Sequence, residues 1–473
     1  MVRAFLALRV GRLLGLTLFV GALLCYRSDE HRQVFGRWSY TYCAVILAAA
    51  VAWLGAILGT RRRARRRDPP PPPVEAAVGL LDLAVLATGI AYWLSAQDAR
   101  ANAARIVDLN LFGSVLPAAS LLEWLALLAL FVAGGIILAP ALGARWVNPA
   151  VGLAALCALA LLGEGVARAA AILSPAIQGF PTYARELWAR RYVHLNHLGF
   201  RDVEHAVRPT PGTRRLLVIG DSFAEGAGIP RLEDRFGEQL GGRLAHATGE
   251  RWEVITASHP DHNTLQELAI LQSVPPYRPD VVVLVYVFND IDYIHPVTPR
   301  SVLAEAPRNI LQRLHPVRVL FKNSYLFQAA YVRARLVSLS DAAAEDPYGD
   351  TVAVRRHLAD LARFVVLAKR TGGVVGIVPF DHTVAADTAN RHRYERFAGR
   401  ALAAGLPVWP IGQAFEGWRL SQLIVNALDA HPNELANRLA AEAAQPQVLA
   451  ALRAGPARSH SSRARSSRAR GPA

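Results

Sequence analysis

Residues 281–290 read VVVLVYVFND and decide the fold class of the chain. The run up to Phe288 is apolar without interruption, which is typical of a parallel strand that is buried on both faces. A polar pair, Asn289 and Asp290, follows at once. The stretch therefore predicts a central strand of a parallel sheet, with polar side chains at its carboxyl end.

Apolar runs of strand length alternate with helix-like segments from about residue 196 onward. A repeated strand–helix–strand order favours a doubly wound parallel sheet with helices on both faces, an α/β/α fold. We expect the other strands at 215–220, 252–257, 373–379 and 406–411, helices at 231–248, 263–272, 351–371 and 391–404, and a last helix that begins near Pro432, because proline suits a first helical position.

The first third of the chain is dominated by long apolar stretches. A helix needs roughly 20 consecutive apolar residues to cross a bilayer. Glu164 and Arg168 interrupt the last stretch, and we expect that helix to leave the membrane near them. An N-terminal multi-span α-helical membrane region with five transmembrane helices is therefore expected, at 4–26, 40–60, 74–97, 117–142 and 149–173.

This contrast divides the chain into four predicted parts. Residues 1–174 form the membrane region, 175–195 a connector, 196–452 the α/β domain and 453–473 a disordered basic tail. The loop at 61–67 is almost entirely arginine, and basic loops of this kind stay in the cytoplasm. Counting five spans from that loop places everything after about residue 175 outside the cytoplasm.

The charge balance excludes a nucleic-acid-binding domain. The chain carries 52 Lys and Arg against 37 Asp and Glu, a formal net charge of +15. The first 174 residues hold 16 Arg and 9 acidic residues, and the tail from Arg453 holds six Arg and no acidic residue. The α/β domain is therefore close to neutral, whereas a nucleic-acid groove needs its basic residues on the folded domain itself.

Three polar motifs follow predicted strands, where the active groups of such sheets gather. Ser222, in the sequence GDS, lies at a strand-to-helix turn and needs a base to become a nucleophile. Asn289 offers a fixed donor suited to a developing oxyanion. Asp429 lies two residues before His431, so its carboxylate can hold the imidazole tautomer while the free nitrogen acts as a base. A turn or a helix cap would explain each motif singly, but together they favour catalysis.

This combination resembles the GDSL, or SGNH, hydrolase family over about residues 196–450. The segment 196–202, NHLGFRD, also looks like the lead-in of membrane-linked bacterial members. The resemblance implies a flavodoxin-like SGNH hydrolase fold that uses neither a metal ion nor an organic cofactor.

The resemblance also implies roles for individual residues. By it, Ser222 is the nucleophile, His431 is the general base, and Asp429 orients and stabilises the imidazole. The oxyanion hole consists of the Asn289 side chain and the backbone amides of Ser222 and Asp261.

The chain departs from the family pattern at three places. Asp261 stands where the family has its oxyanion glycine, and aspartate pays more than glycine for a left-handed conformation. Val287 replaces the usual glycine two residues before Asn289. Asp429 lies two rather than three residues before the histidine, with Leu428 at the commoner place. A binding module with weak catalysis is therefore one alternative reading.

The resulting hypothesis is an extracytoplasmic serine esterase or acylhydrolase, anchored in the inner membrane of a bacterium. Its partners would be the lipid bilayer and an O-acylated cell-surface glycan or lipid. A second alternative is an O-acyltransferase that uses the same site, works on an envelope polymer and has a separate membrane acyl-transfer partner. A metal site formed by His259, Asp261, His262 and Asp292 is disfavoured, because these residues show no recognisable ligand spacing.

Overall fold

The computed structural model describes long helices of the N-terminal part and most of the C-terminal part of the chain. The described residues are 33–34, 38–39, 72–101, 116–138, 147–173, 183–294, 320–321, 323–331, 333, 347–386, 388–426 and 429–454.

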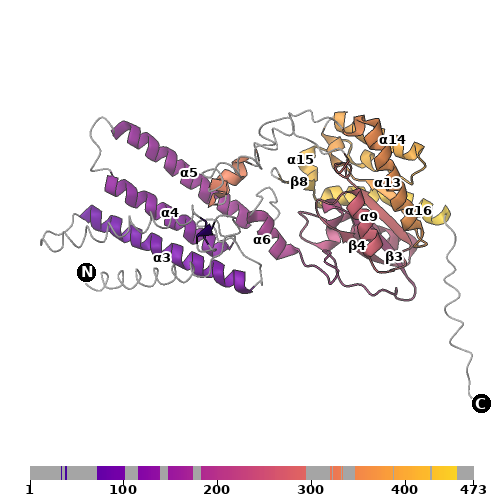
Figure 1. Cartoon of the computed structure of the whole chain (residues 1–473), viewed down its shortest axis with the longest axis horizontal. Helices are drawn as coiled ribbons and strands as arrows, with labels where there is room; N and C mark the ends of the chain where they lie inside the picture. Colours follow the sequence, from indigo (N-terminus) through magenta and orange to yellow (C-terminus); the bar gives the residue numbers. More distant parts are fainter. Residues whose placement is uncertain are drawn as a thin grey trace, which may run out of the picture. The chain divides into compact units, whose positions relative to one another are not determined.

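The chain forms two compact units (Figure 1). The N-terminal unit combines Met1–Leu187 with Ser301–Ser340, and the C-terminal unit combines Trp188–Arg300 with Asp341–Ala473. The predicted division assigned residues 196–452 to a single domain, whereas Ser301–Ser340 group with the N-terminal residues. This segment leaves the C-terminal unit and joins the N-terminal helices.

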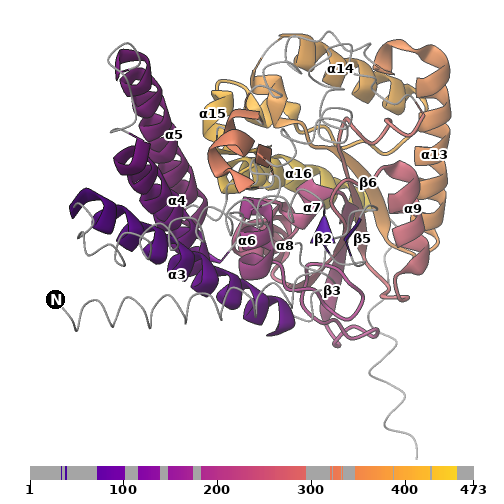
Figure 2. The ribbon, with the colours of Figure 1, turned by 60° about the vertical axis from the view of Figure 1, so that its left-hand side comes forward.

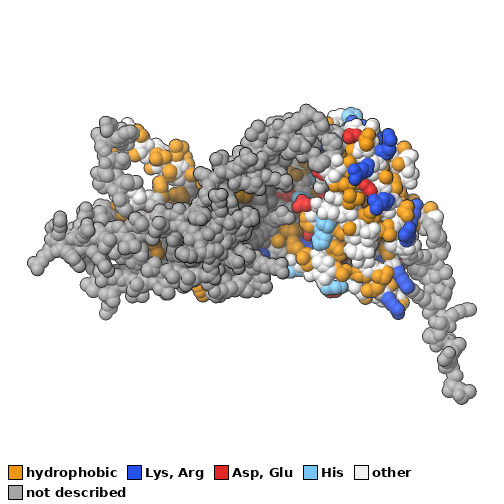
Figure 3. All heavy atoms as spheres, viewed as in Figure 1, with side chains coloured by type: hydrophobic (Ala, Val, Ile, Leu, Met, Phe, Trp, Pro, Cys, Tyr) orange, Lys and Arg blue, Asp and Glu red, His pale blue; other side chains and the backbone are white. Residues whose placement is uncertain are grey.

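Three long helices of the N-terminal unit are apolar enough to cross a membrane. They are α3 Pro72–Ala101, α4 Pro117–Leu138 and α5 Val147–Leu173, and they correspond to the predicted spans at 74–97, 117–142 and 149–173. On α5, Leu153, Leu156 and Leu159 are each more than 60% exposed, and Figure 3 shows apolar side chains over this helix. An apolar surface of this kind fits contact with lipid.

The first two predicted spans, at 4–26 and 40–60, and the arginine loop at 61–67 lie outside the described residues. Between those spans the structure describes a short antiparallel pair, β1 Gln33–Val34 and β2 Trp38–Ser39. The total of five spans therefore stays a prediction.

The two charges that interrupt α5 are buried and bonded to one another. The Arg168 guanidinium donates to the Glu164 carboxylate on the preceding turn at 2.8 Å. It also donates to Glu123 on α4 at 3.1 Å and to the carbonyl oxygen of Ser120 at 2.9 Å. This cluster joins α4 to α5 through their interior.

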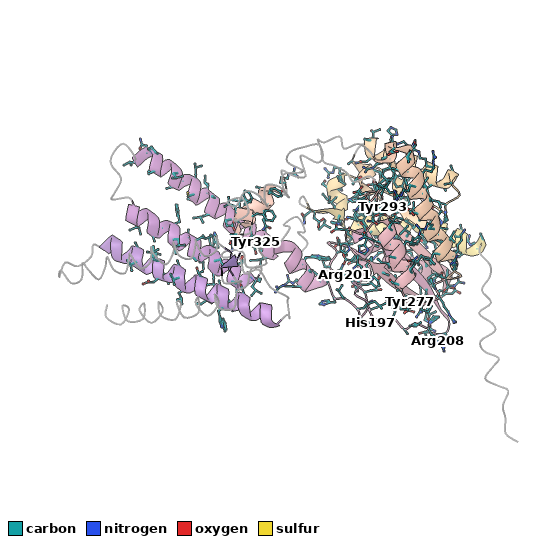
Figure 4. The ribbon with its side chains drawn as sticks, in the orientation of Figure 1. His197, Arg201, Arg208, Tyr277, Tyr293 and Tyr325 are labelled. Carbon is teal, nitrogen blue, oxygen red and sulfur yellow. The ribbon has the colours of Figure 1, made fainter. Side chains whose placement is uncertain are left out.

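The same Glu164 carboxylate holds part of the segment 301–340. It accepts hydrogen bonds from the Ser324 hydroxyl at 2.7 Å and from the backbone amides of Tyr325 and Leu326, both at 3.0 Å. Residues 325–331 are helical, so Glu164 satisfies amide groups that the first turn of a helix leaves free. Figure 4 labels Tyr325 within this unit.

The C-terminal unit is built on a parallel sheet, which confirms the predicted sheet. Its strands are β3 Thr213–Gly220, β4 Arg251–Ser258, β5 Val281–Tyr286 and β6 Val374–Pro379, in the order β4-β3-β5-β6. Every residue of β5 is buried, as its continuous apolar run requires. The order places β3 beside β5 although β4 lies between them in the sequence, which makes their carboxyl ends a topological switch point.

Helices cover both faces of this sheet (Figure 2). One layer contains α8 Phe236–Thr248 and α16 Glu434–Ala454, and the other contains α9 Thr264–Ser273 and α13 Thr351–Lys369. The remaining elements are α6 Tyr183–Tyr192, α7 Ser222–Glu225, η3 Leu232–Asp234, η4 Pro347–Gly349, η5 His382–Ala385, α14 Thr388–Ala403, η6 Gly412–Phe415, α15 Leu420–Leu423, β7 Ile424–Asn426 and β8 Asp429–Pro432.

One local prediction was wrong, and for a second the position was right but the role given to proline was wrong. The segment 406–411 makes only a single bridge, between Val408 and Ile377 of β6. Pro407 and Pro410 lack the N–H groups that a ladder needs, so the strand cannot continue. The last helix, α16, begins at Glu434, near Pro432 as predicted, but Pro432 ends β8 and is not the first helical residue. Asn433 caps the helix by accepting from the Ala436 amide at 3.1 Å.

Candidate active site

Ser222 is the first residue of the short helix α7, directly after β3. The turn before it is tight, because a Cβ atom on Gly220 would lie 2.8 Å from both the Ala224 Cβ and the Val285 carbonyl oxygen. The Asp221 side chain caps the helix by accepting from the Phe223 amide at 2.9 Å. Ser222 is thereby held at the carboxyl end of the sheet and is 7% exposed.

His431 lies on β8, which pairs antiparallel with β7. Its Nε2 atom lies 3.0 Å from the Ser222 Oγ atom, and its Nδ1 atom lies 2.6 Å from Asp429 Oδ1. The same oxygen accepts from the His431 backbone amide at 3.0 Å. The structure thus brings the three predicted residues together, and the two-residue spacing suffices because Asp429 reaches both the ring and the backbone of His431. Leu428, at the commoner spacing, lies outside the described residues.

The charges around His431 favour its protonated form. Burial by itself would lower the pKa of the imidazole, but the hydrogen bond and charge of Asp429 raise it, and so do the charges of Asp221 and Asp261. The pKa of His431 is raised overall. A base of this kind takes a proton readily and is held in one orientation while it does so.

Asn289 lies in the turn that follows β5, next to the Ser222 turn. Its side chain is hydrogen-bonded to Asp221, the residue before Ser222. The turn closes through a bond from the Asp290 amide to the Val287 carbonyl oxygen at 3.0 Å and one from the Val287 amide to the Asp290 carboxylate at 2.9 Å. Val287 is not among the described residues with a positive φ, so the missing glycine leaves no strain here.

Asp261 adopts the left-handed conformation that glycine normally supplies, with φ of 62°. Its charge acts on His431, which places it near the same site. Asp261 therefore keeps the backbone conformation that glycine normally supplies, and its charge raises the pKa of His431. The cost is a left-handed conformation on a residue with a Cβ atom.

The histidines that flank Asp261 pack on each other. The rings of His259 and His262 have centroids 5.0 Å apart, and Phe200 lies against His259 at 5.1 Å. Burial lowers the pKa of both imidazoles. In the part of the chain that the structure describes, no group of three or more His, Cys, Asp or Glu could hold a metal ion.

One arginine that the motifs did not single out holds the segment after Ser222. Arg201, in the lead-in 196–202, donates to the carbonyl oxygens of Gly226 at 2.8 Å, Ile229 at 2.6 Å and Tyr192 at 3.0 Å. Its guanidinium lies 4.8 Å from the centre of the Trp188 ring. Arg201, labelled in Figure 4, therefore ties α6 to the loop that follows α7. The lead-in was recognisable from the sequence, but its hydrogen bonds were not.

Three carboxyl groups lie buried beneath the site. Burial raises the pKa of Asp221 to about 6, and it raises the pKa values of Glu267 and Asp290 well above their ordinary range. The charge of Asp221 raises the pKa of Glu267 further. Both carboxyl oxygens of Glu267 lack a hydrogen-bond partner among the described residues. Glu267 was not predicted, because a lone acidic residue on a helix carries no signal in the sequence.

The chain has similarities to a protein family and to solved structures. Residues 218–439 match the model of the GDSL-like Lipase/Acylhydrolase family. Two solved structures are similar over 50% of this chain. One is the crystal structure of TesA, at 18% identity, with 98% of that chain covered and a TM-score of 0.32. The other is the lipase Lip_vut3 from a goat rumen metagenome, at 14% identity, with 97% covered and a TM-score of 0.30. No curated protein matches the chain.

Proposed function

We propose that the chain is a membrane-anchored serine esterase in which Ser222, His431 and Asp429 are the catalytic residues. One observation carries the proposal. The hydroxyl of Ser222, both ring nitrogens of His431 and the carboxylate of Asp429 form a continuous hydrogen-bonded series, at 3.0 and 2.6 Å. The series lies at the switch point of the parallel sheet, within the residues that match the GDSL-like Lipase/Acylhydrolase family.

In the proposed reaction, Ser222 Oγ attacks the ester carbonyl carbon and His431 Nε2 takes the hydroxyl proton. Asp429 stabilises the imidazolium through Nδ1. The tetrahedral oxyanion is bound by the Asn289 side chain and by the backbone amides of Ser222 and Asp261. The C–O bond to the alcohol then breaks, the alcohol leaves with the proton from His431, and an acyl-serine remains. Water, deprotonated by His431, releases the acid and restores Ser222.

The proposed substrate is an O-acyl ester on a cell-surface glycan or lipid. Three helices that are long and apolar enough to cross a membrane belong to the same chain, which supports anchoring at a membrane. The arginine loop at 61–67 supports an extracytoplasmic position for the catalytic domain. If a glycan hydroxyl replaced water in the second half of the reaction, the same residues would transfer the acyl group instead of hydrolysing it.

The test of the active site is labelling of the full chain, in detergent, with a fluorophosphonate probe. We expect stoichiometric labelling of the wild type and none of Ser222→Ala. Ser273→Ala, on α9, is the matched control and should label as the wild type does. Absence of labelling in folded wild-type protein would refute the esterase and leave the binding module. Product analysis with water alone and with an added glycan then separates hydrolysis from acyl transfer.

The orientation has its own test. A reporter that is active only outside the cytoplasm, fused after residue 455, should be active. Activity of a cytoplasmic reporter at the same position would contradict the extracytoplasmic assignment.

A further inference from the structure

A chain of buried hydrogen-bonded side chains lies behind Asn289. The Tyr286 hydroxyl, on β5, lies 2.9 Å from His357 Nε2 on α13 and is also bonded to the Tyr348 hydroxyl on η4. On the other side of the imidazole, the Tyr293 hydroxyl lies 3.4 Å from His357 Nδ1 and donates to Asp360 Oδ2 at 2.8 Å. Tyr286 and His357 are completely buried, and Tyr348 is 2% exposed.

This chain ends on the turn that carries Asn289. The Tyr348 hydroxyl donates to the Phe288 carbonyl oxygen at 3.1 Å. That oxygen and the backbone N–H of Asn289 belong to one planar peptide unit, so a bond that holds the oxygen also fixes the backbone from which the Asn289 side chain extends. The Phe288 ring packs against Tyr348, with centroids 5.0 Å apart, and fixes the peptide from the second side.

The hydrogen bonds in this series of side chains can all be donated in the direction of the Phe288–Asn289 peptide. Burial lowers the pKa of His357 to about 4, so the imidazole is neutral at pH 7 and carries one N–H. With that proton on Nε2, His357 donates to Tyr286, Tyr286 donates to Tyr348, and Tyr348 donates to the Phe288 carbonyl oxygen. Tyr293 then donates to Asp360, and the contact left without a proton is the longest one, at 3.4 Å.

The same hydrogen-bonded side chains also connect the residues before and after the segment 301–340. Tyr293 lies shortly before the segment 301–340, and Tyr348 lies shortly after it. Tyr348 bonds to the Tyr286 hydroxyl, and Tyr293 contacts the His357 ring, which is itself bonded to Tyr286. The point where the segment departs and the point where it returns are therefore held against β5.

We infer that Tyr348, supported by Tyr286 and His357, is a positioning residue for Asn289 in the oxyanion hole. The inference rests on the proposed function, because it concerns the same reaction. Tyr348 does not touch the substrate; it acts by fixing the Phe288–Asn289 peptide. If Tyr348 only packed in the core, its substitution would lower stability alone. If Tyr348 positions Asn289, the effect of its substitution on kcat must disappear when Asn289 is absent.

A double-mutant cycle separates these two roles. In the full chain, with p-nitrophenyl acetate as the substrate, we expect Tyr348→Phe to lower kcat about 10-fold and leave KM within twofold. We expect Asn289→Ala to lower kcat on the order of 100-fold. Added to Asn289→Ala, Tyr348→Phe should cost less than twofold more. An equal loss of kcat in both backgrounds would overturn the inference.

The matched control is Tyr277→Phe, which removes a phenol hydroxyl from the opposite end of the sheet (Figure 4). It should leave kcat within twofold of the wild type. A loss equal to that of Tyr348→Phe would show a general effect of removing phenols and would also overturn the inference.

A readout without turnover keeps this test apart from that of the esterase. In the Ser222→Ala chain, hydrogen exchange of the peptide that contains Asn289 and Asp290 should be faster with Tyr348→Phe than with Tyr277→Phe. Equal exchange would refute the positioning role even if the enzyme is active. If the wild type showed no turnover, the proposed function would fail, and exchange would decide the positioning role alone.

Discussion

The two units of the molecule bury charged groups in opposite ways. In the N-terminal unit, Arg168 is 3% exposed and is bonded to two carboxylates, Glu123 and Glu164. In the C-terminal unit, Asp221, Glu267 and Asp290 are at most 1% exposed, and no Lys or Arg pairs with them in the described part of the chain. One unit compensates its buried charges with a cation, whereas in the other the raised pKa values keep Glu267 and Asp290 protonated and therefore uncharged.

The difference teaches what each arrangement does. A bonded ion cluster fixes geometry, because each partner loses its hydration and depends on the others. Carboxyl groups buried without a cation keep their protons, so their pKa values rise. The first arrangement holds a chain segment in place, and the second makes the region around the site sensitive to pH.

The largest effect is expected from substitution of Asp429, a buried carboxylate that is bonded to the proposed base. This carboxylate is 4% exposed, and its Oδ1 atom lies 2.6 Å from the Nδ1 atom of His431. Asp429→Asn should lower kcat on the order of 10³- to 10⁴-fold, because the amide favours the wrong tautomer. Ester hydrolysis by the full chain measures it. The pH at which the rate falls on the acid side should also drop, since the hydrogen bond and charge that raise the pKa of His431 are lost.

The rate depends on a neutral base, so wild-type activity should fall as pH drops through the raised pKa of His431, above 6.5. An Asp429→Asn enzyme with an unchanged acid limb would show that Asp429 does not set this pKa.

The next effect concerns the ion cluster of the N-terminal unit. Arg168→Met should destabilise the full chain in detergent by about 3–5 kcal/mol, because two buried carboxylates lose their cation. Thermal unfolding measures it. Adding Glu123→Gln and Glu164→Gln should recover part of the loss, since the amides carry no charge. Val166→Ala, at a position on α5 that is 63% exposed, is the control and should change little. No recovery in the triple variant would contradict the role of charge.

A smaller and pH-dependent effect is expected at Glu267. Its pKa is raised in the folded chain, so the folded state binds a proton that the unfolded state releases above about pH 4.3. Stability therefore falls as pH rises from that value toward the folded pKa. Glu267→Gln cannot titrate, so its melting temperature should exceed that of the wild type by a few degrees at pH 8 and by nothing at pH 4.

Glu442→Gln, on α16, is the control because this carboxylate is 62% exposed. Its melting temperature should follow that of the wild type at both pH values. A Glu267→Gln chain that is less stable than the wild type at pH 8 would show that the carboxyl group is needed there in its charged form.

The smallest effect is expected at Asp261. Glycine adopts a φ of 62° without strain, so Asp261→Gly should relieve about 1–2 kcal/mol of backbone strain. Glycine also increases the conformational entropy of the unfolded chain, which lowers the free energy of unfolding by about 0.5–1 kcal/mol. A net gain on the order of 0.5 kcal/mol should appear in urea unfolding, and the pKa of His431 should fall slightly. A net loss of stability would mean that the Asp261 side chain contributes more than its strain costs.

Local patterns were sufficient for the sheet and for the groups at its edge. The continuous apolar run of β5 indicates a buried strand by itself, whereas the GDS and DAH motifs indicate a site only in combination. The strand predicted at 406–411 was wrong because the prediction relied on its apolar residues and neglected its two prolines. The spacing of Asp429 departed from the family, yet the structure shows the carboxylate in contact with the ring.

Long-range partners could not be predicted in the same way. Glu164 and Arg168 indicated where an apolar stretch ends, but their bonds to Glu123 and to residues 323–326 link positions more than 40 residues apart. Tyr348 and His357 carry no motif, and only the packed fold brings them to β5. Buried polar groups need partners, but the sequence does not state which ones.

The bonds between Glu164 and the segment 301–340 have a consequence for the order of synthesis. Arg168 and Asn323 are 155 residues apart, and at 5–20 residues per second the ribosome needs roughly 8–30 s to travel that distance. During this interval the amide groups that Glu164 binds in the folded chain have not yet been synthesised. The strands β3, β4 and β5 are synthesised before them. Assembly of the N-terminal unit therefore finishes only after β3, β4 and β5 of the C-terminal sheet have been synthesised.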